Sequence, residues 1–148
     1  MEPTKKAESY DKIKNLGKGA YGLAMLCKAK GSGQLVCVKQ MDISKMDEEE
    51  RKEALMEAKL QEACVHPNIV AFHEVYKTKK GRLCIVMEYC DGGDLQQLVK
   101  EKKDNKEQLS DDAGLDIFVQ IILSIKYLHA RRVMHRDIKS QNIFMMGD

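Results

Sequence analysis

The most informative part of this 148-residue chain is the octapeptide His135-Arg136-Asp137-Ile138-Lys139-Ser140-Gln141-Asn142. It places one carboxylate, one ammonium group and one amide at fixed offsets, the set that phosphoryl transfer needs beside the transferred phosphate. In that chemistry Asp137 would accept the proton of an attacking hydroxyl, Lys139 would neutralise charge on the phosphoryl oxygens and Asn142 would hold a magnesium ion. Each residue alone has an ordinary structural explanation, but their joint spacing directly after a long amphipathic helix favours a catalytic loop.

Composition indicates a globular chain of nearly balanced charge. Hydrophobic residues make up 43% and charged residues 32%, which is typical of a folded domain. The net charge of +2 arises from 25 basic and 23 acidic side chains, so charge gives no case for a nucleic acid or membrane partner. Residues 1–11 contain no apolar signal-peptide core, and we expect no run of membrane-spanning length. The five cysteines form no C-x-x-C pair and their number is odd, which indicates reduced thiols in the cytosol or nucleus.

The first part of the chain predicts strands with one inserted helix. An acidic first turn suits a helix over residues 47–64, and His66-Pro67-Asn68 is expected to end it because proline restricts the residue before it. The strand-like segments, separated by glycine and lysine turns, are residues 10–16, 22–29, 35–39, 70–76 and 83–87.

The rest of the chain predicts mainly helix. Asp91-Gly92-Gly93-Asp94 breaks the strand pattern and is expected to form a hinge between two lobes, followed by a short helix over residues 95–100. The mixed-charge run of residues 100–107 is interpreted as a solvated loop. Ser110 is expected to cap a long helix from Asp111 to about Arg131. Its apolar residues recur at helical spacing and predict one buried face; they are Leu115, Phe118, Ile121, Ile122, Ile125 and Leu128.

The segment Gly17-Lys18-Gly19-Ala20-Tyr21-Gly22 matches the pattern G-x-G-x-x-G. A dinucleotide-binding turn of this kind needs a strand before it and a helix after it. Here strand-like sequence lies on both sides, which favours a glycine-rich hairpin that covers phosphates. An ordinary glycine turn stays open as the alternative.

Lys39 ends the third predicted strand, where a lysine is ordinarily just solvated. A carboxylate on the following helix would instead hold it against the phosphates of a nucleotide, and Glu57 is the first candidate. Glu53 lies one turn earlier on the same helical face and is the fallback. Residues 87–90 could pair through their backbone with an adenine edge, and Asp94 could either bond a ribose hydroxyl or cap a helix.

Together these residues resemble a eukaryotic protein kinase domain, over about Tyr10 to the end of the chain. The resemblance is closest to the NIMA-related serine/threonine kinases, which are associated with mitosis, centrosomes and cilia. The narrower resemblance is carried by residues 85–95, 66–70 and 135–144. Lys139, two residues after Asp137, favours the serine/threonine version of the loop over the tyrosine version.

The resemblance implies an α+β fold in which a five-stranded antiparallel sheet with one helix precedes the helical start of a second lobe. Residues 1–9 would form a tail, 10–90 the N-lobe and hinge, and 91–148 the start of the C-lobe. The resemblance also implies ATP and Mg²⁺ as cofactors and a protein substrate with serine or threonine hydroxyls.

Residue by residue, the resemblance assigns Asp137 as the catalytic base, Lys139 as the charge stabiliser and Asn142 as a magnesium ligand. Met87 would be the gatekeeper and Cys90 would supply hinge backbone contacts. The full set assigned to ATP binding is Leu16, Gly17, Gly19, Gly22, Ala24, Cys37, Lys39, Glu57, Met87, Glu88, Cys90 and Asp94. Two positions depart from the general kinase pattern: Ala24 stands where valine is usual, and Cys37 replaces an alanine and would face the adenine.

Residues 1–148 contain no Asp-Phe-Gly, no activation loop and no Ala-Pro-Glu. We therefore expect these residues alone to transfer phosphate at or near background, because the second magnesium ligand lies in the Asp-Phe-Gly. The long helix would then expose an apolar face and favour self-association. The alternative function is a truncated, non-catalytic module that binds ATP or a partner, and a reading frame that continues to Asp-Phe-Gly would favour the enzyme. A cytoplasmic location is expected, with centrosome, cilium or nucleus implied by the resemblance.

Overall fold

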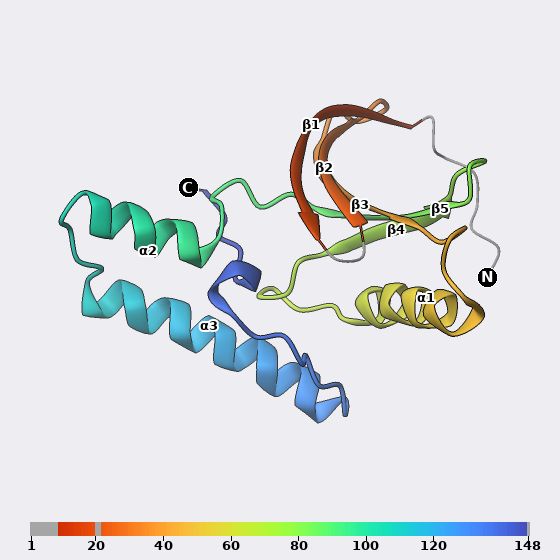
Figure 1. Cartoon of the computed structure of the whole chain (residues 1–148). Coiled ribbons are helices and arrows are strands. Elements are labelled where there is room, and N and C mark those ends of the chain that lie inside the picture. The colour runs from red at the N-terminus through yellow and green to blue at the C-terminus, as the bar shows by residue number, and fades with distance from the viewer. Residues whose placement is uncertain (1–8, 20–21, 148) are drawn as a thin grey trace. The chain divides into compact units, whose positions relative to one another are not determined.

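The computed structural model describes residues 9–19 and 22–147, and they form two compact units. The first unit holds the described residues up to Val65 together with Ala71–Tyr89, and it contains all five strands and one helix (Figure 1). The second unit holds His66–Val70 and the described residues from Cys90 onward, with two α-helices and a short 3₁₀ turn. The predicted tail lies outside the described residues except for Ser9.

The first unit is built on the predicted five-stranded antiparallel sheet, which is confirmed. The strands are β1 (Tyr10–Gly19), β2 (Gly22–Ala29), β3 (Leu35–Asp42), β4 (Phe72–Lys77) and β5 (Arg82–Glu88). Their order across the sheet is β1-β2-β3-β5-β4, so β1 and β4 are its two edges. β1 runs beyond its predicted end at Leu16 because Gly17 and Gly19 continue the ladder, pairing with Ala24 and Gly22.

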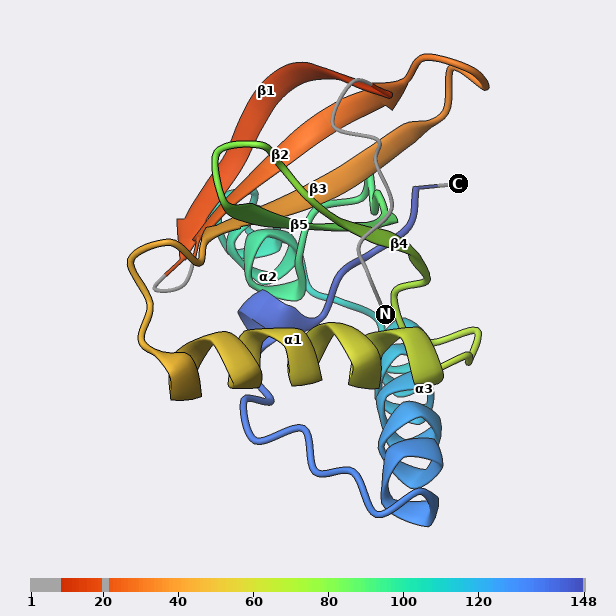
Figure 2. The same cartoon turned by 90° about the vertical axis from the view of Figure 1, so that its right-hand side faces the viewer.

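Side chains alternate between the two faces of this sheet, as the period of a strand requires. One face carries a core cluster that includes Val38, Tyr76 and Cys84. The other face carries Met41 and Ile85, which pack with the single helix of the unit, α1 (Glu48–Ala63). Figure 2 shows α1 running beside the sheet.

Helix α1 has a well-formed beginning. Asp47 accepts a hydrogen bond from the backbone N–H of Glu50, and the Glu50 carboxylate accepts one from the backbone N–H of Asp47. This reciprocal capping satisfies two backbone donors that the first turn leaves unpaired. The residues that α1 buries are small, Ala54 and Ala58, so the helix lies close to the sheet through a narrow apolar strip.

In the second unit, α2 (Leu95–Asp104) is longer than predicted. The run of residues 100–107 was expected to be a loop, and that prediction is wrong for its first half, which is helical. Lysine and glutamate are good helix formers, and Lys102 and Lys103 lie in the last turn, where cations suit the helix dipole. The Nζ of Lys102 also lies 2.6 Å from the carboxylate of Glu107, just beyond the helix.

Helix α3 (Asp111–Ala130) begins as predicted, with the Ser110 hydroxyl accepting a hydrogen bond from the Ala113 N–H. The prediction of one buried apolar face is largely wrong in this structure. Leu128 is buried, whereas Leu115 and Phe118 are 59% and 58% exposed. The exposed side chains agree instead with the apolar patch that was expected for residues 1–148.

Among the described residues, α3 is also the one helix long and apolar enough to cross a membrane, with 20 residues and a mean hydropathy of 1.3. This corrects the expectation that no run reaches such a length. The finding that α3 could cross a membrane rests on length and composition alone, and helices that form the core of a folded domain meet the same criterion.

The segment after α3 leads to η1 (Ser140–Asn142) and then pairs with the start of the second unit. The Gly92 N–H donates to the Met145 carbonyl at 2.9 Å, and the Met145 N–H donates to the Gly93 carbonyl at 2.8 Å. Residues 66–70 also belong to this unit, where the Asn68 side-chain amide donates a hydrogen bond to the side-chain oxygen of Gln120 on α3 at 2.9 Å.

Candidate active site

The three glycines of the predicted hairpin differ in the space that surrounds them. Among the described residues, a Cβ added at Gly17 would meet no atom within 4 Å, and one at Gly19 would meet only the Gly22 carbonyl oxygen, at 4.0 Å. A Cβ at Gly22 would lie 2.2 Å from the Gln40 carbonyl oxygen, which is a severe overlap. The first two glycines therefore leave open surface, while the third is required by the packing of β2 on β3. Ala20 and Tyr21 lie outside the described residues.

Strand register brings several predicted site residues onto one face of the sheet. Gly17 pairs with Ala24, and Ala24 pairs with Lys39, so these three side-chain positions form a row across β1, β2 and β3. Cys37 pairs with Met87 one step further along the sheet. Because directly opposite residues share a face, all five lie on the side of the sheet that also packs against α1.

Lys39 and Glu57 form an ion pair, with the Lys39 Nζ 2.6 Å from the Glu57 Oε1. The structure thus pairs the lysine with the first-choice glutamate of the sequence prediction, and the fallback Glu53 is an exposed residue of α1. The two side chains are 31% and 51% exposed, so water screens the pair and its contribution to stability is small. The contact fixes the direction of the lysine more than it stabilises the fold.

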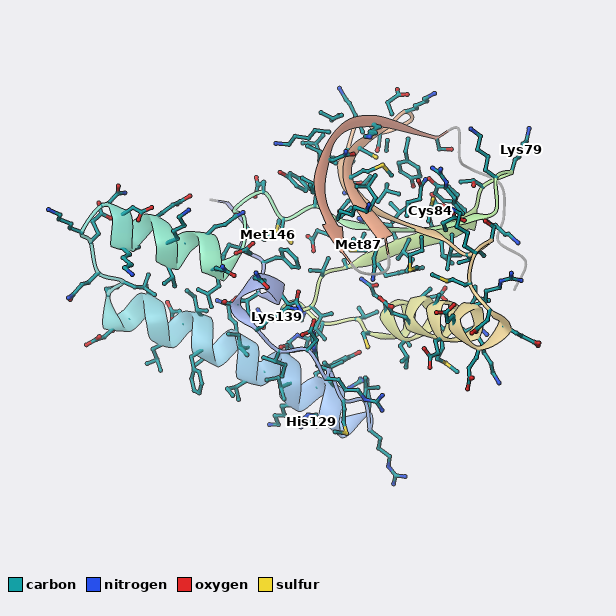
Figure 3. The ribbon with its side chains drawn as sticks, viewed as in Figure 1. Lys79, Cys84, Met87, His129, Lys139 and Met146 are labelled. Carbon is teal, nitrogen blue, oxygen red and sulfur yellow. The ribbon has the colours of Figure 1, made fainter. Side chains whose placement is uncertain are left out.

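Gln61 is a residue of this region that the sequence prediction missed. Its side-chain amide donates to the Met87 Sδ at 3.7 Å, and Met87 lies on β5 (Figure 3). Gln61 follows Glu57 by four residues, so both lie on the same face of α1. That spacing is the signal that could have identified it. α1 is therefore linked to β3 and to β5 through two polar contacts one turn apart.

The remaining predicted nucleotide contacts are dispersed. Leu16 is exposed and lies at a register irregularity of β1. The Glu88 backbone N–H donates to the Ala71 carbonyl at 2.9 Å, while Cys90 is the first residue of the second unit after Tyr89. Asp94 caps α2 by accepting from the Gln97 N–H at 2.9 Å, as one of its two interpretations predicted.

The catalytic-loop residues lie together in the second unit. The Lys139 Nζ is 3.0 Å from the Asp137 Oδ2. The Asn142 amide nitrogen donates to the same Oδ2 at 2.9 Å and to the Asp137 backbone carbonyl at 2.8 Å. Lys139 immediately precedes η1 (Figure 3), and that turn brings the Asn142 side chain back to Asp137. The structure therefore assembles two groups of predicted residues, one in each unit.

These contacts act on the ionisation of Asp137. The hydrogen bond from Lys139 holds the pKa of the Asp137 carboxyl below its ordinary value, and the hydrogen bond from Asn142 adds to the effect. The positive charge of Lys139 and the nearby His135 lower that pKa further. The carboxylate is therefore ionised at neutral pH and able to accept a hydrogen bond from a hydroxyl group.

The donor atoms of this loop suit a hard cation. Both of these hydrogen bonds of the Asn142 amide use its nitrogen, so neither of them occupies the amide oxygen. Amide and carboxylate oxygens are the protein ligands that Mg²⁺ prefers. In the part of the chain that the structure describes, no group of three or more His, Cys, Asp or Glu side chains could form a metal site on its own. A magnesium ion here would accordingly share its ligands with a phosphate-bearing substrate.

The chain combines a sheet with a glycine hairpin, a lysine–glutamate pair and an aspartate–lysine–asparagine loop. These features are typical of a phosphoryl-transfer domain. Residues 10–148 match the family described as the protein kinase domain, and the chain belongs to that family.

Relatives that the chain matches include several NIMA-related kinases. It is 44% identical over 138 residues to serine/threonine-protein kinase Nek5 of Homo sapiens, covering 93% of this chain and 19% of that protein. It is 42% identical over 139 residues to serine/threonine-protein kinase Nek3 of Mus musculus (93% of this chain, 26% of that protein). It is 41% identical over 141 residues to serine/threonine-protein kinase Nek1 of Mus musculus (95% and 12%). The chain thus spans about a quarter or less of these relatives.

Proposed function

We propose that this chain provides the nucleotide-binding and catalytic-loop part of a NIMA-related serine/threonine protein kinase. The reaction transfers the γ-phosphoryl group of ATP to a serine or threonine hydroxyl of a protein. The observation that carries the proposal is the joint geometry of the Asp137, Lys139 and Asn142 side chains, together with the Lys39–Glu57 ion pair. We infer that the first unit is the N-lobe and that the second is the start of the C-lobe.

In the first unit, the proposed nucleotide site uses the sheet face defined by register. Gly17 and Gly19 leave room for phosphates to approach the backbone, which suits their predicted role. Lys39, directed by Glu57, contacts the α- and β-phosphates. Cys37 and Met87, paired across β3 and β5, would border the adenine, while Glu88 and Cys90 supply backbone contacts to its edge.

In the second unit, Asp137 orients the attacking hydroxyl and accepts its proton as the phosphoryl group transfers. The lowered pKa of its carboxyl supports the first of these tasks, because an ionised carboxylate accepts the hydroxyl hydrogen bond at neutral pH. Lys139 lies within 3.0 Å of that carboxylate, so its charge is placed beside the position of the hydroxyl. There it would offset negative charge that develops on the phosphoryl oxygens.

Magnesium would be held by the side-chain oxygen of Asn142 together with phosphate oxygens. Bound in this way it supplies electrostatic neutralisation of the phosphates. The contribution of the chain is to hold Asn142 against Asp137, so that the metal ligand and the base keep a fixed spacing.

A non-catalytic module remains the second candidate. Within residues 1–148, Asn142 is the one magnesium ligand that the family resemblance assigns. This favours binding of ATP without efficient transfer of its phosphoryl group. We therefore propose that residues 1–148 bind Mg-ATP, and that phosphotransfer requires a longer product extending to an Asp-Phe-Gly.

The test compares residues 1–148 with any longer product of the same reading frame, using γ-labelled ATP, Mg²⁺ and casein. The proposal predicts background labelling by the short chain and magnesium-dependent labelling by the longer one, lost in Asp137→Asn. A short chain that labels casein strongly would overturn the requirement for the longer product. A frame that stops after Asp148, in a chain that binds Mg-ATP, would favour the module. Failure of both products to bind ATP would overturn the nucleotide site itself.

Two further properties are proposed. A cytoplasmic location, with the centrosome, cilium or nucleus as specific addresses, is supported by the resemblance to NIMA-related kinases. Self-association of residues 1–148 is supported by the exposure of Leu115, Phe118 and Ile122 on one face of α3. Light scattering at increasing concentration tests the second property, and a monomer throughout would contradict it.

A further inference from the structure

Tyr10 joins the two edges of the sheet, although its partners lie more than sixty residues away. It is the first residue of β1, and its hydroxyl donates a hydrogen bond to the carboxylate of Glu74 on β4. β1 and β4 are the outermost strands of the order β1-β2-β3-β5-β4. A side-chain contact between them therefore closes the curled sheet, whose curvature is visible in Figure 2.

The contact has a second part. The ring of Tyr10 stacks on the ring of Tyr76, with centroids 6.1 Å apart and planes 5° from parallel. Tyr76 is buried and belongs to the core cluster that includes Cys84, and Tyr10 packs against that cluster. Burial, followed by the hydrogen bond to Glu74, raises the pKa of the Tyr10 hydroxyl well above its ordinary value. The hydroxyl thus stays protonated and able to donate.

The rest of β1 has little other attachment. Its residues from Asp11 to Gly19 are all exposed, and its ladder pairs it with β2 alone. Register shifts interrupt that ladder between Lys12 and Lys14 and again between Asn15 and Gly17. The ladder with β2 holds β1 along its length, and its two irregularities are the points at which the strand can bend. Tyr10 adds a side-chain attachment of β1 to the core at one end of the strand, and Gly17 and Gly19 lie at its other end.

We propose that Tyr10, Glu74 and Tyr76 form a clasp that positions β1, and through it Gly17 and Gly19, for contact with the phosphates of a nucleotide. Tyr10 and Glu74 are positioning residues in this proposal, since neither is expected to touch the nucleotide. The proposal rests on the nucleotide site of the proposed function.

The test measures binding of two probes, Mg-ATP and adenosine, to the 148-residue chain and its variants. Adenosine lacks phosphates, so a change confined to the glycine loop should alter ATP binding alone. The variants are Tyr10→Phe, Glu74→Ala and their combination, all titrated at a temperature well below every melting transition. The matched control is Asp11→Asn, which removes an exposed ion pair to Lys30 from the next residue of β1.

The clasp predicts that Tyr10→Phe weakens Mg-ATP binding by about threefold to tenfold and leaves adenosine binding within about twofold. The double variant should bind ATP no more weakly than the weaker single variant, because both changes remove one contact. Asp11→Asn should match the wild type. If Tyr10→Phe does not fold, Glu74→Ala alone gives the same comparison.

Three results would overturn the clasp. Unchanged ATP binding in folded variants contradicts the proposal while leaving the nucleotide site intact. Equal weakening of ATP and adenosine shows a general loss of structure rather than positioning of the glycines. A wild-type chain that binds neither probe overturns the nucleotide site, and the clasp with it.

Discussion

Replacing Gly22 with alanine should separate the structural glycine of the hairpin from the two open ones. The added Cβ would lie 2.2 Å from the carbonyl oxygen of Gln40, and 3.1 Å from the Cγ of Met41. Real Cβ contacts essentially never fall below 3.0 Å, so β2 and β3 must separate by close to an ångström at this point. Met41 is 1% exposed, so its side chain is enclosed by the core.

The expected cost follows from two effects. A shift of that size breaks one or two ladder hydrogen bonds, each contributing about 1 kcal/mol. Overpacking beside a buried side chain adds about 1–3 kcal/mol. Gly22→Ala should therefore lower the free energy of unfolding by about 2–5 kcal/mol, a large part of the stability of a small domain.

Gly17→Ala and Gly19→Ala are the matched comparisons, because their added Cβ atoms meet no atom of the described part of the chain closer than 4.0 Å. Neither glycine has a positive φ, so alanine introduces no strain, and each variant should unfold within about 0.5 kcal/mol of the wild type. Both should nevertheless bind Mg-ATP more weakly. Urea denaturation followed by far-UV circular dichroism measures the stabilities. A Gly22→Ala chain as stable as the wild type would refute the packing argument.

Three further predictions concern single side chains. Glu57→Gln should cost less than about 1 kcal/mol of stability, because water screens the ion pair with Lys39, yet it should weaken Mg-ATP binding about tenfold. The control Glu53→Gln, at an exposed position, should change neither quantity. Denaturation and nucleotide titration measure the two quantities, and equal effects at both positions would contradict the prediction. Arg132→Gly should stabilise the chain by about 1 kcal/mol, because Arg132 holds a φ of 59° at the end of α3, where its N–H donates to the His129 carbonyl. Arg131→Gly, which removes a guanidinium 3.6 Å from the Tyr127 ring centroid, should destabilise it in the same denaturation experiment. Lys139→Met should raise the pKa of Asp137 toward its ordinary value, since the Lys139 hydrogen bond is the largest cause of the lowering. A carbon-detected NMR titration of the carboxyl group measures this, and an unchanged pKa would assign the lowering to Asn142 instead.

The sign of the Asp137 effect sets its pH range. Its folded-state pKa is depressed, so the interactions with Lys139 and Asn142 favour the folded ionised form above the unfolded-state pKa. That preference is lost as the pH falls through the lower, folded-state value. The carboxylate should accordingly remain charged through mildly acidic conditions in the wild type, and protonate at a higher pH in Lys139→Met.

Local patterns predicted most of the fold because the relevant physics is local. Strand alternation and glycine turns placed the five strands, and Ser110 was predicted as a helix cap. Asp47 was predicted as part of an acidic first turn, and the structure shows it as the cap of α1 instead. The extent of α2 was missed because a mixed-charge run of lysine and glutamate suits both a solvated loop and an exposed helix. Periodicity along α3 showed which residues share a face, but not whether another element covers that face.

The contacts among the site residues were predicted more completely in the second unit than in the first. The spacing of Asp137, Lys139 and Asn142 is fixed within one short loop, so the sequence was sufficient to bring them together. Glu53 and Glu57 share a face of α1, and the contact with Lys39 depends on how that helix lies on the sheet. The Tyr10–Glu74 contact has no local signal, because it is created by the curvature of the whole sheet.

The central claim is that residues 1–148 form a nucleotide site organised around Lys39. Calorimetric titration of the purified chain with Mg-ATP, beside Lys39→Met, tests it most directly. The wild type should show saturable binding and the variant at least about tenfold weaker binding, with both proteins melting cooperatively at similar temperatures. Equal binding by two folded proteins would contradict the assignment of Lys39, and no binding by a folded wild type would contradict the nucleotide site.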